Sequence, residues 1–122
     1  MSTQNINSVI SVVPVKNFEK AFEWYKNLFG REPDVVPMEG IAEWQLIENA
    51  WIQVATDQEH AGRTTVVIGV NDVEAQRKAY SGVNFSIGEI VEYPGIIKMA
   101  EITDPEGNKV SFVQDISNNS DH

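Results

Sequence analysis

The clearest pattern in the chain is the spacing of apolar residues between Phe18 and Phe29. They fall at positions 18, 21, 22, 25, 28 and 29, which is the spacing of one face of a helix. Asn17 is suited to cap the start of this helix, because its side chain accepts a hydrogen bond from the first turn. Gly30 is suited to end it, because glycine readily adopts the left-handed conformation. The pattern predicts a helix over residues 18–29.

Most of the remaining apolar residues alternate with polar ones or form short β-branched runs, which predicts strands. The predicted strands cover residues 8–15, 41–47, 51–55, 64–70, 86–93, 96–103 and 109–114. A shorter helix is predicted over 73–80, with Asp72 as its cap. Residues 31–40 contain Pro33, Pro37 and Gly40 and predict a loop, and residues 48–50 predict a hairpin link.

Residues 15–25 and 70–80 repeat one pattern, 55 positions apart. In each copy a β-branched strand leads through a capping residue, Asn17 or Asp72, into a helix, and Tyr25 aligns with Tyr80. This repeat indicates a duplication. We predict an α+β fold in which one domain, residues 1–122, contains two modules, about 6–56 and 63–115. Such a chain tends to bind its ligand where the two copies meet.

The composition indicates which class of fold and which cell compartment to expect for the protein. With 122 residues, of which 42% are apolar, the chain can bury a core. No run of 18 apolar residues occurs, and the first seven residues carry no charged side chain, so neither a membrane span nor a signal peptide is expected. The absence of cysteine excludes disulfides and thiolate metal sites and fits a reducing compartment. We therefore expect a cytoplasmic protein.

The charge balance narrows the choice of partner. Eighteen acidic and nine basic residues give a net charge of −9. This charge repels polyphosphates, so we expect no nucleic acid and no anionic membrane as a partner. It also favours cationic ligands over anionic ones.

Three segments together resemble the vicinal oxygen chelate superfamily, which includes glyoxalase I, extradiol dioxygenases, fosfomycin-resistance enzymes and bleomycin-resistance proteins. They are the stretch from Val15 to Gly30, the second copy at Val70-Asn71-Asp72, and the closing turn Asp104-Pro105-Glu106-Gly107-Asn108. The resemblance covers nearly the whole chain. It implies two βαβββ modules whose sheets curl into a cleft, usually completed in a homodimer.

The resemblance also implies where a metal would bind. In metal-dependent members a His or Glu lies in the first strand of each module, and a Glu or similar ligand lies in the last strand. The corresponding residues here are Ile10 and Thr65 in the first strands and Gln53 and Ser111 in the last strands. Ile10 has no donor atom, and neutral oxygens neither balance the charge of a transition metal nor bind it as imidazole does. We therefore predict no metal and no cofactor.

Strand alternation places Trp51 on the same face as Gln53, and this face is the predicted cleft. An apolar trough with a few neutral hydrogen-bonding groups suits a small molecule. Trp44 and Tyr93 are predicted at its rim, with the alternative that Trp44 and Trp51 fill the core or a dimer interface. Glu101 shares a face with apolar residues, where it could meet a cationic group or act as a base. The predicted ligand-binding residues are Trp51, Gln53, Thr65, Ser111, Ile10, Glu101, Trp44 and Tyr93.

Three hypotheses about function follow. The first is a metal-free, homodimeric binding protein similar to the bleomycin-resistance group, which sequesters a hydrophobic or aromatic small molecule, with a cation favoured by the charge. The second is a lyase or dioxygenase-like enzyme of the same superfamily with a non-standard site, using Glu101 in acid–base chemistry. The third is that the second sheet is an interface for another protein chain. The sequence leaves open whether any catalysis occurs.

Overall fold

The computed structural model describes residues 5–80 and 85–117 and divides the chain into two compact units. Unit 1 extends to Thr64 and also includes Pro105–Asn108. Unit 2 comprises Thr65–Asp104 and resumes at Lys109.

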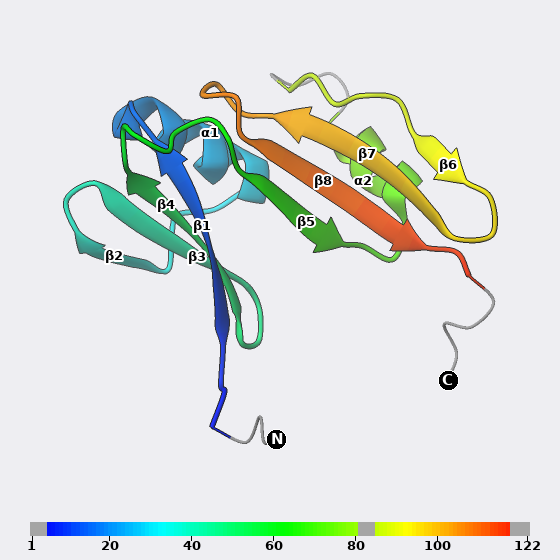
Figure 1. Ribbon diagram of the computed structural model, residues 1–122, viewed down its shortest axis with the longest axis horizontal. Coiled ribbons are helices and arrows are strands. Elements are labelled where there is room, and N and C mark those ends of the chain that lie inside the picture. The colour runs from blue at the N-terminus through cyan, green and yellow to red at the C-terminus, as the bar shows by residue number, and fades with distance from the viewer. Residues whose placement is uncertain (1–4, 81–84, 118–122) are drawn as a thin grey trace. The chain divides into compact units, whose positions relative to one another are not determined.

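Unit 1 contains β1 (Val9–Val15), α1 (Phe18–Phe29), β2 (Val35–Met38), β3 (Ile41–Ile47) and β4 (Ala50–Thr56). Its four strands form one sheet in the order β1-β4-β3-β2 (Figure 1). The β1–β4 pair is parallel, and the β3–β4 and β2–β3 pairs are antiparallel.

Unit 2 repeats this arrangement with β5 (Thr65–Gly69), α2 (Val73–Ala79), β6 (Val91–Tyr93), β7 (Ile97–Thr103) and β8 (Lys109–Asp115). Its sheet has the order β5-β8-β7-β6, again with one parallel pair, β5–β8. Both units thus have the order strand, helix and three strands. The predicted α+β class and the two βαβββ modules are confirmed.

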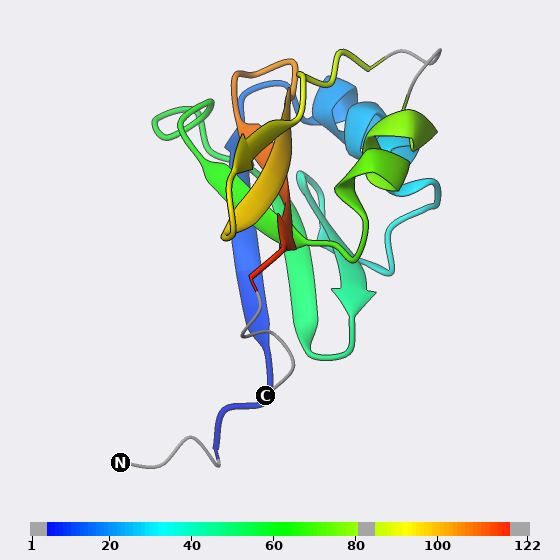
Figure 2. The same ribbon diagram turned by 90° about the vertical axis from the view of Figure 1, so that its right-hand side faces the viewer.

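The two helices begin at the predicted caps. Asn17 accepts a hydrogen bond from the backbone N–H of Lys20 at 3.1 Å, and Asp72 accepts one from Ala75 at 3.1 Å. Gly30 ends α1 in the left-handed conformation, with φ of 73°. Each helix covers one face of its own sheet (Figure 2), which leaves the other face of that sheet without a helix from the same unit.

The core of unit 1 lies between α1 and its sheet. Ala21, Tyr25 and Leu28 of α1 are buried, as are the sheet residues Val13, Val15, Ala42, Trp44, Ile52 and Val54. In unit 2 the buried residues include Val66, Val73, Tyr80, Ala100, Ile102, Val110 and Phe112. On β1, β4, β5 and β8 the residues of these cores alternate with the residues of the opposite sheet face.

The prediction of a loop over residues 31–40 is wrong in part, because the segment contains β2. This strand pairs with β3 through Val35↔Glu43 and Met38↔Ile41, with an irregularity between them. Proline lacks the N–H that a central strand needs, but an edge strand tolerates it, since its outer side has no partner strand. Pro37 therefore explains why the sequence pattern did not predict β2, although the strand forms at the edge of the sheet.

The predicted strand over residues 86–93 is also too long. Only Val91–Tyr93 is a strand, and Ile87 forms a single bridge with Ile102. The Arg77 side chain donates to the carbonyl of Gly88 at 2.8 Å, so this carbonyl is used by a side chain. Glycine also weakens a strand interior, which adds to the interruption.

The closing turn belongs to unit 1 and is fixed by polar side chains. The Glu106 carboxylate accepts a hydrogen bond from the backbone N–H of Asn17 at 2.7 Å. The buried Asn108 side chain donates to the carbonyl of Pro14 at 2.9 Å and accepts from the N–H of Thr64 at 3.0 Å. These bonds give the acidic turn a structural role.

No helix among the described residues is long and apolar enough to cross a membrane.

Candidate ligand-binding site

The predicted ligand-binding residues divide between the two sheets. In each unit we call the sheet face that carries no helix of that unit the open face. On the open face of unit 1, strand register places side chains in rows that run across the sheet. One row contains Ile10, Trp51 and Gln45, and the next contains Val12, Gln53 and Glu43.

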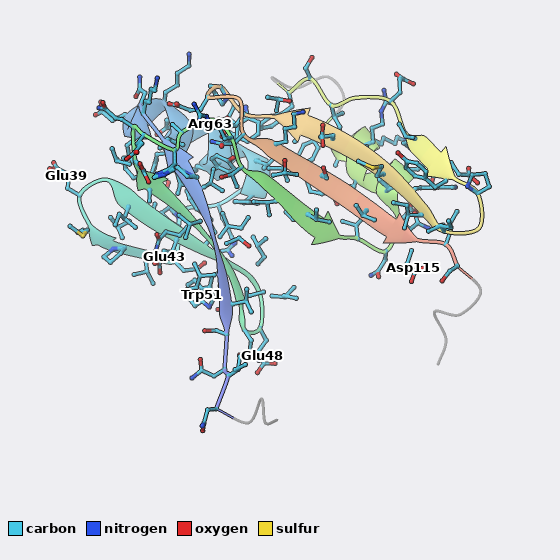
Figure 3. All side chains as sticks on the ribbon, in the orientation of Figure 1. Glu39, Glu43, Glu48, Trp51, Arg63 and Asp115 are labelled. Carbon is cyan, nitrogen blue, oxygen red and sulfur yellow. The ribbon has the colours of Figure 1, made fainter. Side chains whose placement is uncertain are left out.

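The open face of unit 1 is apolar on β1 and polar on β3. Ile10 and Val12 are 46% and 47% exposed, and Trp51 is half-buried beside them. The Gln53 side-chain amide donates to Glu43 Oε2 at 2.6 Å. Glu43 and Trp51 lie on the neighbouring strands β3 and β4 (Figure 3). An aromatic surface therefore adjoins a carboxylate that is held by an amide.

The backbone around Glu43 is fixed by β2 and the loop before it. The carbonyl of Glu43 accepts from the backbone N–H of Asp34 at 2.8 Å. The Asp34 carboxylate in turn accepts from the N–H of Gln45 at 2.7 Å and from Arg31 at 2.8 Å. These hydrogen bonds, the one from Gln45 first, hold the pKa of Asp34 below its usual value. Asp34 therefore stays ionised, and its hydrogen bonds hold β3, the strand that carries Glu43, in place.

The open face of unit 2 has a corresponding polar pair. The Ser111 hydroxyl donates to Glu101 Oε2 at 2.7 Å, and Ser111 is only 3% exposed. Val67 lies beside Ser111 in the same row. The neighbouring row contains Thr65, Lys109 and Thr103, and Lys109 Nζ lies 4.0 Å from Glu101 Oε1.

Tyr93 is the predicted rim residue of unit 2. It is 49% exposed and lies opposite Ile97 on the edge pair β6–β7. Alternation from Ile97 through Met99 places Glu101 on the same sheet face. Tyr93 is thus on the open face, two rows away from Glu101 along β7.

The prediction that Trp44 contributes to the rim is wrong. Its side chain is 0% exposed and lies on the helix-covered face of β3. The ring centroids of Phe22 and Phe29 are 5.9 and 5.7 Å from that of Trp44. The indole N–H donates to the carbonyl of Arg31 at 3.0 Å. Alternation along β3 explains the position, since Trp44 adjoins Glu43 in sequence and must point to the opposite face.

Glu43 is the site residue that sequence reasoning missed. It lies 58 positions before Glu101, and Gln53 lies 58 positions before Ser111, so the two hydrogen-bonded pairs are equivalent in the repeat. The first strands of the two units are 55 positions apart, whereas these pairs are 58 positions apart, because the segment between the helix and the last two strands differs in length between the units. The offset of 55 therefore does not reveal that the pairs are equivalent. Alternation of Ile41, Glu43 and Gln45 was the available signal.

Comparison with known proteins supports the fold. No family model matches the sequence, and neither does any curated protein. Among solved structures, a glyoxalase/bleomycin resistance protein from Catenulispora acidiphila is 28% identical, with a TM-score of 0.81; the match covers 88% of this chain and 97% of that one. The chain therefore has the glyoxalase/bleomycin resistance fold, which is the fold of the vicinal oxygen chelate superfamily.

Two other structures show that this fold occurs both in a binding protein and in an enzyme. The bleomycin-binding protein from Streptomyces verticillus, complexed with copper(II)-bleomycin, is 17% identical, with a TM-score of 0.70 and coverage of 86% of this chain and 93% of that one. A lactoylglutathione lyase from Agrobacterium tumefaciens is 14% identical, with a TM-score of 0.74 and coverage of 87% and 91%. At these identities the likeness concerns the fold alone, so function must be argued from the site.

The metal that the superfamily name implies does not fit these residues. Ile10 offers no donor, the Gln53 amide is engaged by Glu43, and the Ser111 hydroxyl donates to Glu101. Among residues 5–80 and 85–117, no three His, Cys, Asp or Glu side chains lie together in a group that could hold a metal ion. A divalent transition metal generally needs three or more such ligands from the protein.

Proposed function

We propose that this protein is a metal-free binding protein that sequesters a hydrophobic or aromatic small molecule. The observation that carries the proposal is the position of Trp51. It lies half-buried on a sheet face between the exposed Ile10 and the polar Gln45, one row from the Gln53–Glu43 pair. A large apolar surface next to a few polar groups is typical of small-molecule sites.

The charge of the chain supports a cationic ligand. The net charge of −9 gives a field that concentrates cations, and a tryptophan face attracts a cation at close range. A planar, hydrophobic cation would combine both interactions. Gln53 is the neutral group of unit 1 that we propose orients the ligand.

We also propose a cytoplasmic homodimer. Several large apolar side chains of unit 1 are exposed, among them Val36, Met38 and Ile47. Association of two copies of a chain buries exposed apolar side chains of this kind. A second copy of the chain would cover part of it, and the ligand would cover another part.

Binding measured by calorimetry tests the proposal. A panel of planar aromatic amidines and arylmethylamines, which are cations at neutral pH, is titrated into the wild type, into Trp51→Ala and into Trp24→Phe. Stacking of a cation on tryptophan contributes about 0.5–2 kcal/mol, so Trp51→Ala should weaken binding by roughly three- to thirtyfold. Trp24 lies on α1, outside the open face, so Trp24→Phe should bind like the wild type. Equal affinities for all three proteins would remove Trp51 from the site.

The second candidate function is an enzyme that uses Glu101 as a base. The observation in its favour is the 2.7 Å hydrogen bond from Ser111 to Glu101 on the open face of unit 2. A binding protein returns its ligand unchanged, whereas an enzyme converts it. Chromatography of the ligand after prolonged incubation with the protein therefore separates the two functions, and conversion that is lost in Glu101→Gln would favour the enzyme.

A further inference from the structure

One polar pair occurs in both units at equivalent places. Glu43 and Gln53 lie directly opposite each other on β3 and β4, and Glu101 and Ser111 do so on β7 and β8. In each unit the residue of the last strand donates to Oε2 of the glutamate, at 2.6 and 2.7 Å. The flanking row differs completely between the copies, since Trp51 in unit 1 corresponds to Lys109 in unit 2.

The Glu43 carboxylate has one oxygen to offer to a ligand. The Gln53 amide engages Oε2. Within the described part of the chain, Oε1 of Glu43 has no hydrogen-bond partner, and no Lys, Arg or His nitrogen lies within 4.0 Å of the carboxylate. A half-buried carboxylate of this kind accepts N–H donors strongly, because a hydrogen bond to a charged group is about twice as strong as a neutral one.

Glu101 is less suited than Glu43 to accept hydrogen bonds from a cationic ligand. Lys109 Nζ lies 4.0 Å from its Oε1 and supplies a positive charge from within the protein. A ligand cation at Glu101 would meet this ammonium group, and no aromatic side chain takes the place of Trp51 in its row. The two pairs are therefore alike in geometry and unlike in charge.

We propose that Glu43 selects the ligand of this protein by accepting N–H bonds from an amidinium, guanidinium or ammonium group, while the aromatic part of that ligand lies on Trp51. This inference rests on the proposed function. Gln53 is a positioning residue, which holds the carboxylate through Oε2. Trp51 is the diagonal neighbour of Glu43 across the β3–β4 pair, so one small ligand can reach both side chains.

The test uses two probes of the same shape and different charge, 2-naphthamidine and 2-naphthamide. Calorimetry gives the ratio of their affinities, which we call the cation preference. The wild type should bind the amidine more tightly. Loss of a hydrogen-bonded charge interaction should reduce the cation preference of Glu43→Gln by about tenfold or more, with little change in the affinity for the amide.

Three matched variants complete the experiment. Glu19→Gln makes the same change at an exposed position of α1, outside the open face, and should keep the full cation preference. Gln53→Ala should lower the preference in part, which a merely structural role would not do. Trp51→Ala should weaken both probes by a similar factor. Circular dichroism melting curves confirm that each variant is folded. Should Glu43→Gln unfold, the double variant Glu43→Leu/Gln53→Leu takes its place, because it replaces both partners of the hydrogen bond by apolar side chains.

The outcomes separate the proposed binding function from the proposed role of Glu43. Binding of both probes that depends on Trp51, with an unchanged cation preference in Glu43→Gln, would overturn the role of Glu43 and leave the proposed function standing. Failure of the wild type to bind either probe, or binding that is indifferent to Trp51, would overturn the proposed function and this inference with it. A cation preference lost equally in Glu19→Gln would show that net charge, and not Glu43, selects the cation.

Discussion

The two tryptophans of the first hairpin should differ sharply in their effect on stability. Trp44 is fully buried beneath α1, whereas Trp51 is half-buried on the open face. Truncation of a buried Trp to alanine costs about 3–5 kcal/mol, through lost transfer free energy and the cavity left behind. In Trp44→Ala the carbonyl of Arg31 also loses its donor. Trp51→Ala should cost less, about 1–2 kcal/mol, since part of the side chain already lies in water and its truncation leaves no closed cavity.

Urea unfolding followed by far-UV circular dichroism measures this difference without relying on tryptophan fluorescence. With a typical slope of about 1–3 kcal/mol per molar urea, Trp44→Ala should lower the midpoint by roughly 2 M and Trp51→Ala by about 1 M or less. Trp44→Phe keeps an aromatic ring against Phe22 and Phe29 and should fall between them. A loss in Trp51→Ala equal to that in Trp44→Ala would refute the assignment of the two faces of β4 and β3.

Three further predictions concern other parts of the chain. Asn108→Leu should lower the free energy of unfolding by about 2–5 kcal/mol, because the Pro14 carbonyl and the Thr64 N–H lose their partner. A thermal melt checks this, with the same substitution at an exposed asparagine, Asn27→Leu, as the control, and an unchanged melting temperature of Asn108→Leu would contradict it. The hydrogen bond between Asp57 and His60, 2.9 Å long, holds the pKa of Asp57 below its usual 3.8, so this carboxylate contributes stability above that pH and loses it as the pH falls further. Asp57→Asn should therefore lower stability at pH 6 and flatten its decline below about pH 4 in urea titrations; parallel curves for the two proteins would argue against the pair. Light scattering at micromolar concentration should give the mass of a dimer, and a monomer mass that persists at high concentration would exclude the proposed homodimer.

Local patterns were sufficient to predict most of the fold. The spacing of apolar residues from Phe18 to Phe29, with Asn17 and Gly30 at its ends, predicted α1 to the residue. The duplication predicted that both units begin with a strand and a helix and continue with further strands, and the resemblance to the superfamily implied the full βαβββ order. The misses occurred where tertiary pairing overrides local preference, as at Pro37 in β2 and at Gly88, whose carbonyl is bound by Arg77.

The candidate site was harder to predict, because it depends on which residues face each other across strands. Alternation correctly placed Trp51 and Gln53 on one face, yet the register that sets Glu43 opposite Gln53 is not visible in either strand alone. Alternation also gave enough information to place Trp44 away from that face, once Glu43 was assigned to it. The prediction for Trp44 was wrong because an aromatic residue can lie on either face of a strand, and residue type alone does not show which face it occupies.

The central claim is that a ligand lies on Trp51 and not on Trp44. The most direct measurement is a ¹H–¹⁵N correlation spectrum of the indole N–H groups during titration with 2-naphthamidine. The three tryptophan signals are assigned with the variants Trp24→Phe, Trp44→Phe and Trp51→Phe. The account predicts that the signal of Trp51 shifts progressively and saturates, while that of Trp44, which is buried beneath α1, stays nearly in place. A saturating shift confined to Trp44 or Trp24, with the Trp51 signal unmoved, would contradict it.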